Sequence, residues 1–346
     1  MGFGGTWIAD LSPAEATKVV RTAFDLGVTY FDTAKLDGDS EEKIGAALKG
    51  VRDQCIIATK TGSRTKRESL EDLKESLRRL QTDRLDIIQL HGIDDERTLG
   101  KAIGEDGVLQ TCKQARREGL VDFVGITSHK PRVLVKAIET GEFDTVLVPL
   151  NVVTRQALEE LVPYAKAHDV GVAVMKPFSA KTSKLVTCLY QPSLSLLSDE
   201  PKLKKLLGQD SDSMARSALR FVLSQDISVV IPGLKSVAEA EVAAKTGKEF
   251  AGLTVEEEKR FTVQLHTYCR DCGACLPCPE GIDVAAVLRF STLATAYDLR
   301  EWAGKLYGRL EVKADKCCGC SLCEPKCPYE LPIVKMLRET DRTLRQ

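Results

Sequence analysis

The sequence predicts an α/β protein: a (β/α)8 TIM barrel followed by a small α-helical, cysteine-rich domain. Eight short β-branched segments alternate with amphipathic helical segments from the N-terminus to about residue 244. The strand segments are hydrophobic almost throughout, which is typical of a parallel sheet wrapped by helices. An open doubly wound sheet is the alternative, but the first strand–helix turn, residues 7–13, lacks the G-x-G-x-x-G typical of that fold. A barrel is therefore favoured.

The strands are expected, in chain order, at residues 2–7, 28–32, 55–60, 85–91, 122–127, 145–150, 170–176 and 228–232. Helices are expected between them. Ser12, Pro13 and Glu15 combine an N-cap, a proline in the first turn and a capping-box glutamate, so a helix should begin there. The same capping pattern occurs at two further pairs, Asp39 with Glu42 and Thr65 with Glu68.

The regular alternation stops between Ser179 and Ser213, where a proline-containing stretch separates the seventh strand from its helix. An insertion there follows the C-terminal end of a strand, which is the active-site face of a barrel, so we expect a lid. We place the barrel domain at residues 1–250 and a helical linker with the cysteine-rich domain at 251–346. Thr254 and Glu257 should cap a linker helix, and a last helix should begin at Ile333.

The composition excludes several classes of protein. The 346 residues are 43% hydrophobic, and 49 Lys and Arg oppose 50 Asp and Glu, so no basic field exists to hold nucleic acid or an acidic membrane. No apolar run reaches the roughly twenty residues that span a bilayer, and the N-terminus does not read as a secretory signal. We expect a cytoplasmic protein that binds a small molecule and neither nucleic acid nor membrane.

Eight of the twelve cysteines form two regularly spaced runs near the C-terminus. In a reducing compartment such runs indicate metal or redox chemistry rather than disulfides. The second run is C-x2-C-x2-C-x3-C-P, the spacing of bacterial two-cluster ferredoxins, and the first differs from it by one residue in the last gap. The candidate metal ligands are Cys269, Cys272, Cys275, Cys278, Cys317, Cys320, Cys323 and Cys327.

We expect these cysteines to bind two 4Fe-4S clusters in a ferredoxin-like domain. Structural zinc is the alternative, but zinc sites usually take two ligands from each of two loops, whereas each loop here carries four thiolates. With the chain-crossing ligation of two-cluster ferredoxins, Cys327 would join the first three cysteines and Cys278 would join Cys317, Cys320 and Cys323. Cys318 should not be a ligand. Two one-electron clusters suit electron transfer to a two-electron reaction.

Three polar residues end three successive strands of the predicted barrel: Asp32, Lys60 and His91. In a barrel these side chains meet over the mouth. The constellation resembles that of the aldo-keto reductases, as do Phe31-Asp32-Thr33-Ala34 and Val230-Ile231-Pro232-Gly233. One branch of that superfamily carries a C-terminal two-cluster domain with similar cysteine runs, so the resemblance covers almost the whole chain.

The resemblance implies a redox reaction on a carbonyl or alcohol. In the family a tyrosine donates a proton to the carbonyl while NADPH delivers hydride, an aspartate and a lysine tune the tyrosine, and a histidine orients the substrate. Asp32, Lys60 and His91 match three of these positions, and Asp37 stands at the place of the tyrosine. A carboxylic acid of pKa ~3.9 is ionised at neutral pH, so Asp37 should be a poor proton donor.

The cofactor positions match only in part. Ser128 and Asn151 resemble the residues that hold the nicotinamide carboxamide in the family, and His129 should lie near the substrate. The stretch after Lys176 lacks the family's glycines, and Val242-Ala243 stands where a Glu-Asn pair meets adenine. NADP(H) is therefore expected to bind weakly.

Two functions follow from these patterns. The first is an iron-sulfur oxidoreductase that couples electron transfer through two clusters to chemistry on a small organic substrate in the barrel. The second is a barrel without reductase activity that serves as an electron-relay or assembly subunit of a larger redox complex. We expect a redox protein partner.

Overall fold

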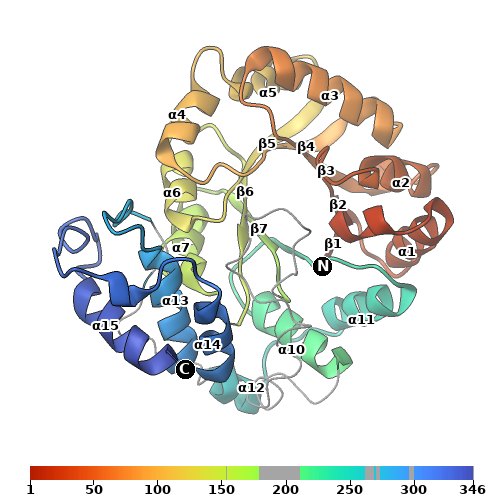
Figure 1. Ribbon diagram of the computed structural model, residues 1–346. Coiled ribbons are helices and arrows are strands. Elements are labelled where there is room, and N and C mark those ends of the chain that lie inside the picture. Colours follow the sequence, from red (N-terminus) through yellow and green to blue (C-terminus); the bar gives the residue numbers. More distant parts are fainter. Residues whose placement is uncertain (153, 179–210, 262–268, 270–272, 296–299, 346) are drawn as a thin grey trace. The chain divides into compact units, whose positions relative to one another are not determined.

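The computed structural model describes the chain except for residues 153, 179–210, 262–268, 270–272, 296–299 and 346 (Figure 1). The chain divides into two compact units, of which the first contains Met1–Ala180 and Asp210–Leu253 and the second contains Thr254–Gln346. Most of the predicted lid, up to residue 210, lies outside the described residues.

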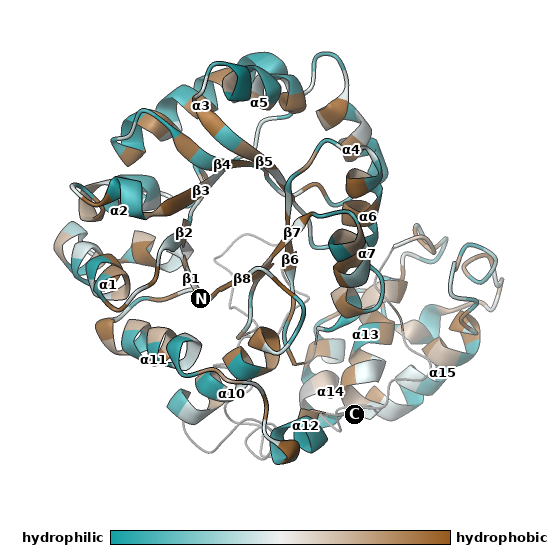
Figure 2. Cartoon of the chain, turned by 180° about the vertical axis from the view of Figure 1, so that it is seen from behind, coloured by the Kyte–Doolittle hydropathy of each residue, from teal (hydrophilic) through white to brown (hydrophobic). Residues whose placement is uncertain are grey.

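Eight parallel strands form one sheet in chain order, as predicted (Figures 1 and 2). Gly4 N donates a hydrogen bond of 2.8 Å to Pro232 O, and Gly4 bridges Gly233, so the two edges of the sheet meet and the barrel is nearly closed. The strands are β1 (Gly2–Gly4), β2 (Tyr30–Asp32), β3 (Ile56–Thr61), β4 (Leu85–Leu90), β5 (Val121–Thr127), β6 (Thr145–Pro149), β7 (Gly171–Met175) and β8 (Val229–Ile231).

Helices surround this ring of strands, and Figure 2 shows the strands as largely hydrophobic. The α-helices are α1 (Pro13–Asp25), α2 (Ser40–Ala47), α3 (Lys66–Leu80), α4 (Glu96–Ile103), α5 (Val108–Arg117), α6 (Pro131–Glu139), α7 (Leu161–Ala167), α10 (Ser211–Leu223) and α11 (Val237–Lys248). The described residues of this unit also form the short 3-10 segments η1 (Gly5–Asp10), η2 (Arg52–Gln54) and η3 (Gln156–Leu158).

Side chains alternate between the helices and the barrel interior along each strand. On β2, Phe31 faces the helices and packs on Phe3 with ring centroids 5.7 Å apart. Tyr30 and Asp32 therefore face the interior. Tyr30 lies deeper and packs against a core cluster of Leu147, Ala173 and Ile231. The polar group of Asp32 is thus left at the C-terminal end of its strand.

Among the barrel helices, the capping predictions were correct at two and wrong at one. Ser12 and Glu15 form both hydrogen bonds of a capping box, and Thr65 accepts from the main chain of α3. Asp39 makes no side-chain cap, because its carboxylate pairs with Lys43 at 2.6 Å instead. The first strand is also shorter than expected, since residues 5–10 form η1.

The second unit is helical, with α12 (Val255–Phe261), α13 (Val284–Thr295), α14 (Arg300–Gly308), η4 (Ala314–Lys316) and α15 (Ile333–Leu344). The capping box of Thr254 and Glu257 forms, and the last helix begins at Ile333, both as predicted. The hydroxyl of buried Tyr307 donates to Asp341 Oδ1 at 2.5 Å and accepts from Ala314 N at 2.9 Å. This phenol ties α14, η4 and α15 together.

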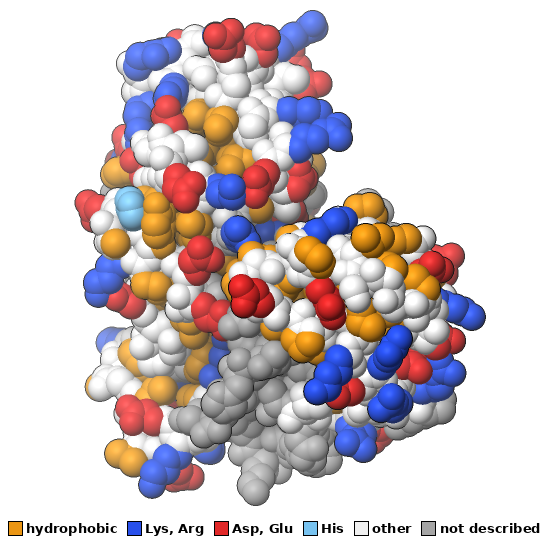
Figure 3. All heavy atoms as spheres, turned by 90° about the vertical axis from the view of Figure 1, so that its left-hand side faces the viewer, with side chains coloured by type: hydrophobic (Ala, Val, Ile, Leu, Met, Phe, Trp, Pro, Cys, Tyr) orange, Lys and Arg blue, Asp and Glu red, His pale blue; other side chains and the backbone are white. Residues whose placement is uncertain are grey.

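The surface agrees with the near-zero net charge. On the face drawn in Figure 3, basic side chains are interspersed with acidic ones among the described residues. None of the helices in the described part of the chain has the length and hydrophobicity needed to cross a bilayer.

Candidate active site and cluster-binding loops

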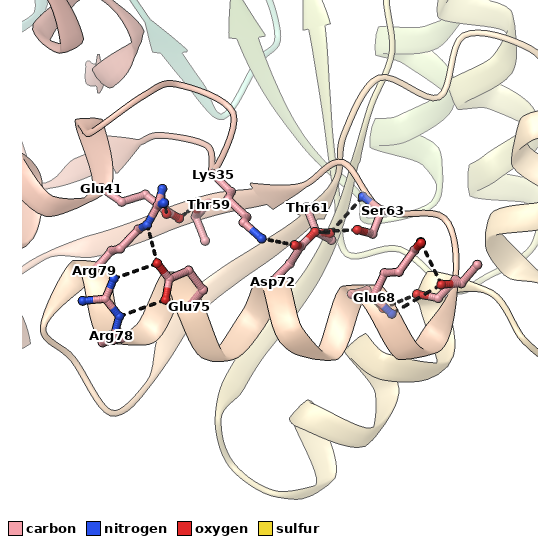
Figure 4. A network of polar contacts seen from close by, with 12 residues as sticks. Lys35, Glu41, Thr59, Thr61, Ser63, Glu68, Asp72, Glu75, Arg78 and Arg79 are labelled. Carbon is pink, nitrogen blue, oxygen red and sulfur yellow. Dashed lines mark hydrogen bonds and ion pairs between the residues drawn. The ribbon is translucent and has the colours of Figure 1, made fainter.

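The orientation of β3 is fixed by polar contacts on its outer side (Figure 4). Thr59 Oγ1 donates to Glu41 Oε1 of α2 at 2.6 Å, and Thr61 Oγ1 donates to Asp72 Oδ2 of α3 at 2.5 Å. Asp72 also pairs with Lys35. Because both threonines point toward the helices, Lys60 between them points into the barrel.

Asp32, Lys60 and Gln89 form a buried polar centre at the ends of β2, β3 and β4. Lys60 Nζ donates to Asp32 Oδ1 and, at 2.7 Å, to Thr33 O, while Gln89 Nε2 donates to Asp32 Oδ2 at 2.9 Å. Both charged side chains are only 7% exposed. A Cβ at Gly125 would lie 3.0 Å from Gln89 Cγ, so glycine leaves room for the amide. Burial raises the pKa of the Asp32 carboxyl, and the Lys60 ammonium opposes that shift.

His91 follows β4 and lies two residues beyond Gln89. Burial, together with the charges of Lys60, His129 and Arg64, lowers the pKa of its imidazole to about 3, so His91 is neutral at physiological pH. Its Nδ1 is buried and has no hydrogen-bond partner among the described residues. Arg64 Nη2 donates to His91 O at 2.7 Å and fixes the backbone at this position. The imidazole therefore has a nitrogen to offer a ligand.

Asp37, which was predicted to stand at the place of the family's tyrosine, lies on the loop between β2 and α2. Its side chain is partly buried. Burial is the largest cause that raises the pKa values of Asp32 and Glu41, and the negative charge of Asp37 raises both as well. The three carboxyl groups therefore lie near one another. The ammonium of Lys60 is paired with Asp32.

A second polar cluster joins the loops after β4, β5 and β7. His129 Nδ1 lies 3.0 Å from Asp94 Oδ2, and His129 Nε2 lies 2.9 Å from Lys176 Nζ. Asp94 Oδ1 accepts from His129 N at 2.7 Å and from Ser128 Oγ at 2.9 Å. Asn151 Nδ2 donates to Lys176 O at 3.0 Å. Although burial acts in the opposite direction, the hydrogen bonds and charge of His129 hold the pKa of the Asp94 carboxyl well below its usual range.

The residues near β8 do not fit the family's NADP(H) site. Glu239 accepts from Lys235 N at 2.8 Å, and its own N–H donates to Ser236 Oγ at 3.2 Å, so a carboxylate occupies the start of α11. A phosphate at that helix start would meet this negative charge. Val242 and Ala243 on α11 offer no polar side chain to adenine. Residues 179–181 of the glycine-poor stretch lie outside the described residues.

In the second unit, both cysteine runs contribute to one surface hollow of about 380 Å³, including space open to solvent. The residues that line it include Cys275, Cys278, Cys317, Cys318, Cys320 and Cys323. Four of these are the predicted ligands of the second cluster, and Cys275 is a predicted ligand of the first, so the hollow brings together cysteines of both predicted sets. Cys272 lies outside the described residues, and Cys269 and Cys327 are partly buried.

Backbone turns bring the second run around the hollow. Gly319 and Ser321 have φ values of 76° and 57°, in the left-handed region that reverses the chain between successive cysteines. A side chain at position 319 would also lie 2.8 Å from Arg338 Nη2. Glu324 Oε1 accepts from Val334 N at 3.0 Å, which attaches the end of this loop to the start of α15.

The arrangement of the thiols fits a cluster. Within the described residues, no three His, Cys, Asp or Glu side chains converge on a position suited to a single metal ion. The cysteines of both runs line one hollow instead, and several thiolates from two loops suit an iron-sulfur cubane better than one zinc ion. Cys318 lines the same hollow as the predicted ligands.

Some site residues were not among those predicted. Gln89 lies two positions before His91 on the inward face of β4, and this period of two could have identified it. Asp94 and Arg64 lie on loops, and no sequence pattern links them to His129 or His91. Lys176 was noted only as the residue before a glycine-poor stretch.

Comparisons with known proteins agree with this architecture. Residues 1–260 match the Aldo/keto reductase family, and residues 268–332 match the 4Fe-4S dicluster domain. An uncharacterized oxidoreductase, YqkF of Bacillus subtilis, is 26% identical and the match covers 73% of this chain and 88% of that protein. L-galactose dehydrogenase of Arabidopsis thaliana is 29% identical, with 74% and 87% covered.

The fold is also that of solved relatives. The holo form of aldo-keto reductase AKR11C1 from Bacillus halodurans superposes with a TM-score of 0.62 at 26% identity, covering 75% of this chain and 90% of that one. The chain therefore belongs to the aldo/keto reductase family and carries a C-terminal 4Fe-4S dicluster domain, which binds two 4Fe-4S clusters.

Proposed function

We propose that this aldo/keto reductase family member is an iron-sulfur oxidoreductase that binds a small carbonyl or alcohol substrate in the barrel and exchanges electrons with it through the dicluster domain. The buried pair of Asp32 and Lys60 carries the proposal. Burying two charges costs desolvation energy that a pair of apolar residues would avoid. A barrel that served only as a scaffold would have no use for this pair at its mouth.

The chain's own groups have distinct roles in this proposal. Lys60 has three N–H donors, of which two bind Asp32 and Thr33 O, so the third is available to a substrate oxygen. His91 is a neutral imidazole with a bare Nδ1 that orients the same substrate. Asp32 accepts from Lys60 and holds its side chain in position.

The eight cysteines of the two runs are proposed as the cluster ligands. Cys278 would join Cys317, Cys320 and Cys323, with which it lines the hollow, and the remaining four would be Cys269, Cys272, Cys275 and Cys327. When bound, each cluster accepts or supplies one electron. A redox protein is the proposed partner that exchanges these electrons, in the reducing cytoplasm.

Electrons should come from the clusters rather than from NADPH. Each hydrogen bond to NADPH that the residues around Val242 and Glu239 fail to provide weakens binding by about 1 kcal/mol, so NADPH should bind about ten- to a hundredfold more weakly than in an ordinary aldo-keto reductase. Calorimetric titration measures this. A dissociation constant of micromolar or below would show that the barrel binds NADPH in another way.

The proposal is tested by anaerobic reoxidation. The holoprotein is reduced with dithionite, freed of excess reductant and mixed with a panel of small aldehydes, ketones and 2-oxo acids while the cluster absorbance is followed. At least one carbonyl class should reoxidise the clusters, and Lys60→Met and His91→Ala should each slow that reaction at least about a hundredfold with iron content unchanged.

The relay function predicts a different result in the same assay. There, no carbonyl or alcohol of the panel exchanges electrons, while a ferredoxin or flavodoxin reoxidises wild type and both variants at equal rates. Asp37→Tyr adds a second comparison. If Asp37 occupies the tyrosine's place, this variant should gain NADPH-dependent aldehyde reduction at saturating NADPH, and wild type should show almost none.

A further inference from the structure

The protonation of the cluster of Asp94, His129 and Lys176 follows from its contacts. Asp94 is ionised, so it only accepts, and the N–H of His129 must lie on Nδ1. In the neutral imidazole Nε2 then carries the lone pair, and Lys176 Nζ lies 2.9 Å from it, within hydrogen-bond distance. The imidazole is therefore oriented by a carboxylate on one side and placed as a base toward an amine on the other.

This is the geometry of an activated nucleophile. A nucleophile and its base lie within hydrogen-bond reach, and a third group orients the base. Loss of a proton from Lys176 Nζ to His129 Nε2 leaves a neutral amine and an imidazolium that faces the Asp94 carboxylate. The side chains of His129 and Asp94 are 34% and 42% exposed, so a small molecule can reach the cluster.

The position of the cluster links it to the barrel mouth. The charge of His129 is one of the causes that lower the pKa of His91, after burial and Lys60, so the two imidazoles lie near each other. Lys176 directly follows β7 and has a φ of 58°, a left-handed conformation that is uncommon for lysine. Asn151 holds the carbonyl of Lys176 in this conformation at 3.0 Å.

We propose that Lys176 forms an imine with a carbonyl compound at the barrel mouth, with His129 as its base and Asp94 as the positioning residue. The amine adds to the carbonyl carbon, the C–O π electrons move to oxygen, and the oxygen leaves as water with two of the three ammonium protons. The ammonium and the carbonyl thus become an iminium and water, with charge and protons conserved and no oxidant or reductant consumed.

An iminium would also answer a difficulty of this site. A carbonyl must be polarised before it accepts electrons, and Asp37 is predicted to stand where the family's tyrosine would do so by proton donation. An iminium carries the positive charge already. In this respect the inference rests on the proposed function, because it takes the substrate to be a carbonyl compound.

The test is reductive trapping with acetaldehyde and sodium cyanoborohydride on the anaerobic holoprotein, followed by peptide mass spectrometry at short times. Hydride from the reagent reduces the iminium at a lysine, and the lysine then carries a stable N-ethyl group. Lys176 should be labelled about tenfold or more faster than Lys166, a lysine of the same barrel whose side chain is 69% exposed and pairs with Asp226. Labelling of Lys176 no faster than Lys166 would overturn the proposal.

Two variants test whether His129 acts as a base and Asp94 as its positioning residue. His129→Gln should reduce labelling of Lys176 to the rate of Lys166, and Asp94→Asn should reduce it less, while Lys166 is labelled equally in all three proteins. Unchanged labelling of Lys176 in His129→Gln would contradict the role of the base. If that variant does not fold, the wild-type comparison still decides the inference.

Trapping also separates this inference from the proposed function. It needs no electron transfer through the clusters. Rapid trapping at Lys176 without cluster reoxidation by any carbonyl would retain the imine and remove the oxidoreductase. Reoxidation of the clusters without selective trapping at Lys176 would retain the oxidoreductase and remove the imine.

Discussion

The barrel mouth and the cysteine hollow are built in opposite ways. At the mouth, Asp32 and Lys60 are almost fully buried, and their partners Gln89 and Thr33 belong to the same polypeptide. At the hollow, Cys318 and Cys320 are exposed, and turns rather than regular elements bring the second run into place. The first site is complete without a ligand, whereas the second is completed by what binds to it.

The physical reason lies in what positions each group. Hydrogen-bonded neighbouring strands fix the register of Asp32, Lys60 and Gln89, and alternation along the strand fixes their direction. The cysteines lie on loops, where free thiolates would repel one another. A bound metal supplies the missing attraction, which is why its binding energy is also folding energy in small metal domains.

The largest expected effect concerns the cluster ligands. The holoprotein should contain about eight irons in two 4Fe-4S clusters, and Cys278→Ser should reduce this to about four because it removes one ligand of the second cluster. Cys318→Ser, in the same hollow, is the matched control and should keep all the iron. Iron analysis and electron paramagnetic resonance after strictly anaerobic purification measure both.

This experiment can break the comparison. If Cys318→Ser loses iron and Cys278→Ser does not, the ligand set is wrong and the hollow is built on another four sulfurs. If the wild type contained zinc instead of iron, the assignment of two iron-sulfur clusters would be wrong. In every case the barrel should keep its own unfolding transition, because its contacts do not depend on metal.

The second effect tests the barrel mouth. Lys60→Met leaves the Asp32 carboxylate buried without its cation, so the free energy of unfolding of the barrel should fall by about 3–5 kcal/mol. Urea denaturation followed by circular dichroism measures it. The double variant Asp32→Asn with Lys60→Met should recover most of the loss, and iron content should not change. A single variant as stable as wild type would mean that the pair is solvated and the mouth is not the rigid site described.

The difference between residues held on strands and residues held on loops explains what the sequence could predict. All eight strands were found from hydrophobic runs, and Asp32, Lys60 and His91 were found because strand ends meet in a barrel. The error at Asp39 shows the limit, because an N-cap pattern does not tell whether the carboxylate will prefer a lysine one turn on.

Contacts between loops could not be predicted. Asp94, His129 and Lys176 follow three different strands, and only the closed sheet brings their loops together. The cysteine runs are the opposite case. Their spacing identified the cluster type, since the ligand itself demands that spacing, but the sequence could not tell that Cys318 lines the same hollow.

A smaller effect should appear in the pH dependence of barrel stability. His91 has a folded-state pKa of about 3, below the ordinary value near 6.5, so between these values the unfolded chain binds a proton that the folded chain does not. Stability should therefore fall as the pH drops below about 6.5. The contribution should reach about 1–2 kcal/mol at pH 5.

The His91→Asn variant isolates this term. It should lose less stability than wild type between pH 7 and pH 5, because all other titrating groups are shared and cancel in the difference. Equal losses in the two proteins would mean that the imidazole is solvated and would remove the argument for a neutral His91 with a buried Nδ1.

The smallest effect asks whether the second unit has any stability of its own. Tyr307→Phe removes the hydroxyl that binds Asp341 and Ala314 N, and it leaves a buried N–H without a partner. In the holoprotein this should lower the free energy of unfolding of that unit by about 1–2 kcal/mol, because Arg345 still pairs with Asp341. Lys305→Ala, which breaks an exposed pair with Glu301 on α14, is the control and should change nothing measurable.

A second measurement compares wild type and Tyr307→Phe after the clusters are removed with a chelator. If binding of the clusters folds this unit, its transition disappears in the apoprotein and wild type and Tyr307→Phe become indistinguishable. If a transition persists and Tyr307→Phe still lowers it, the helices hold themselves together, and the contrast between a self-sufficient barrel and a metal-dependent domain applies to the cysteine loops alone.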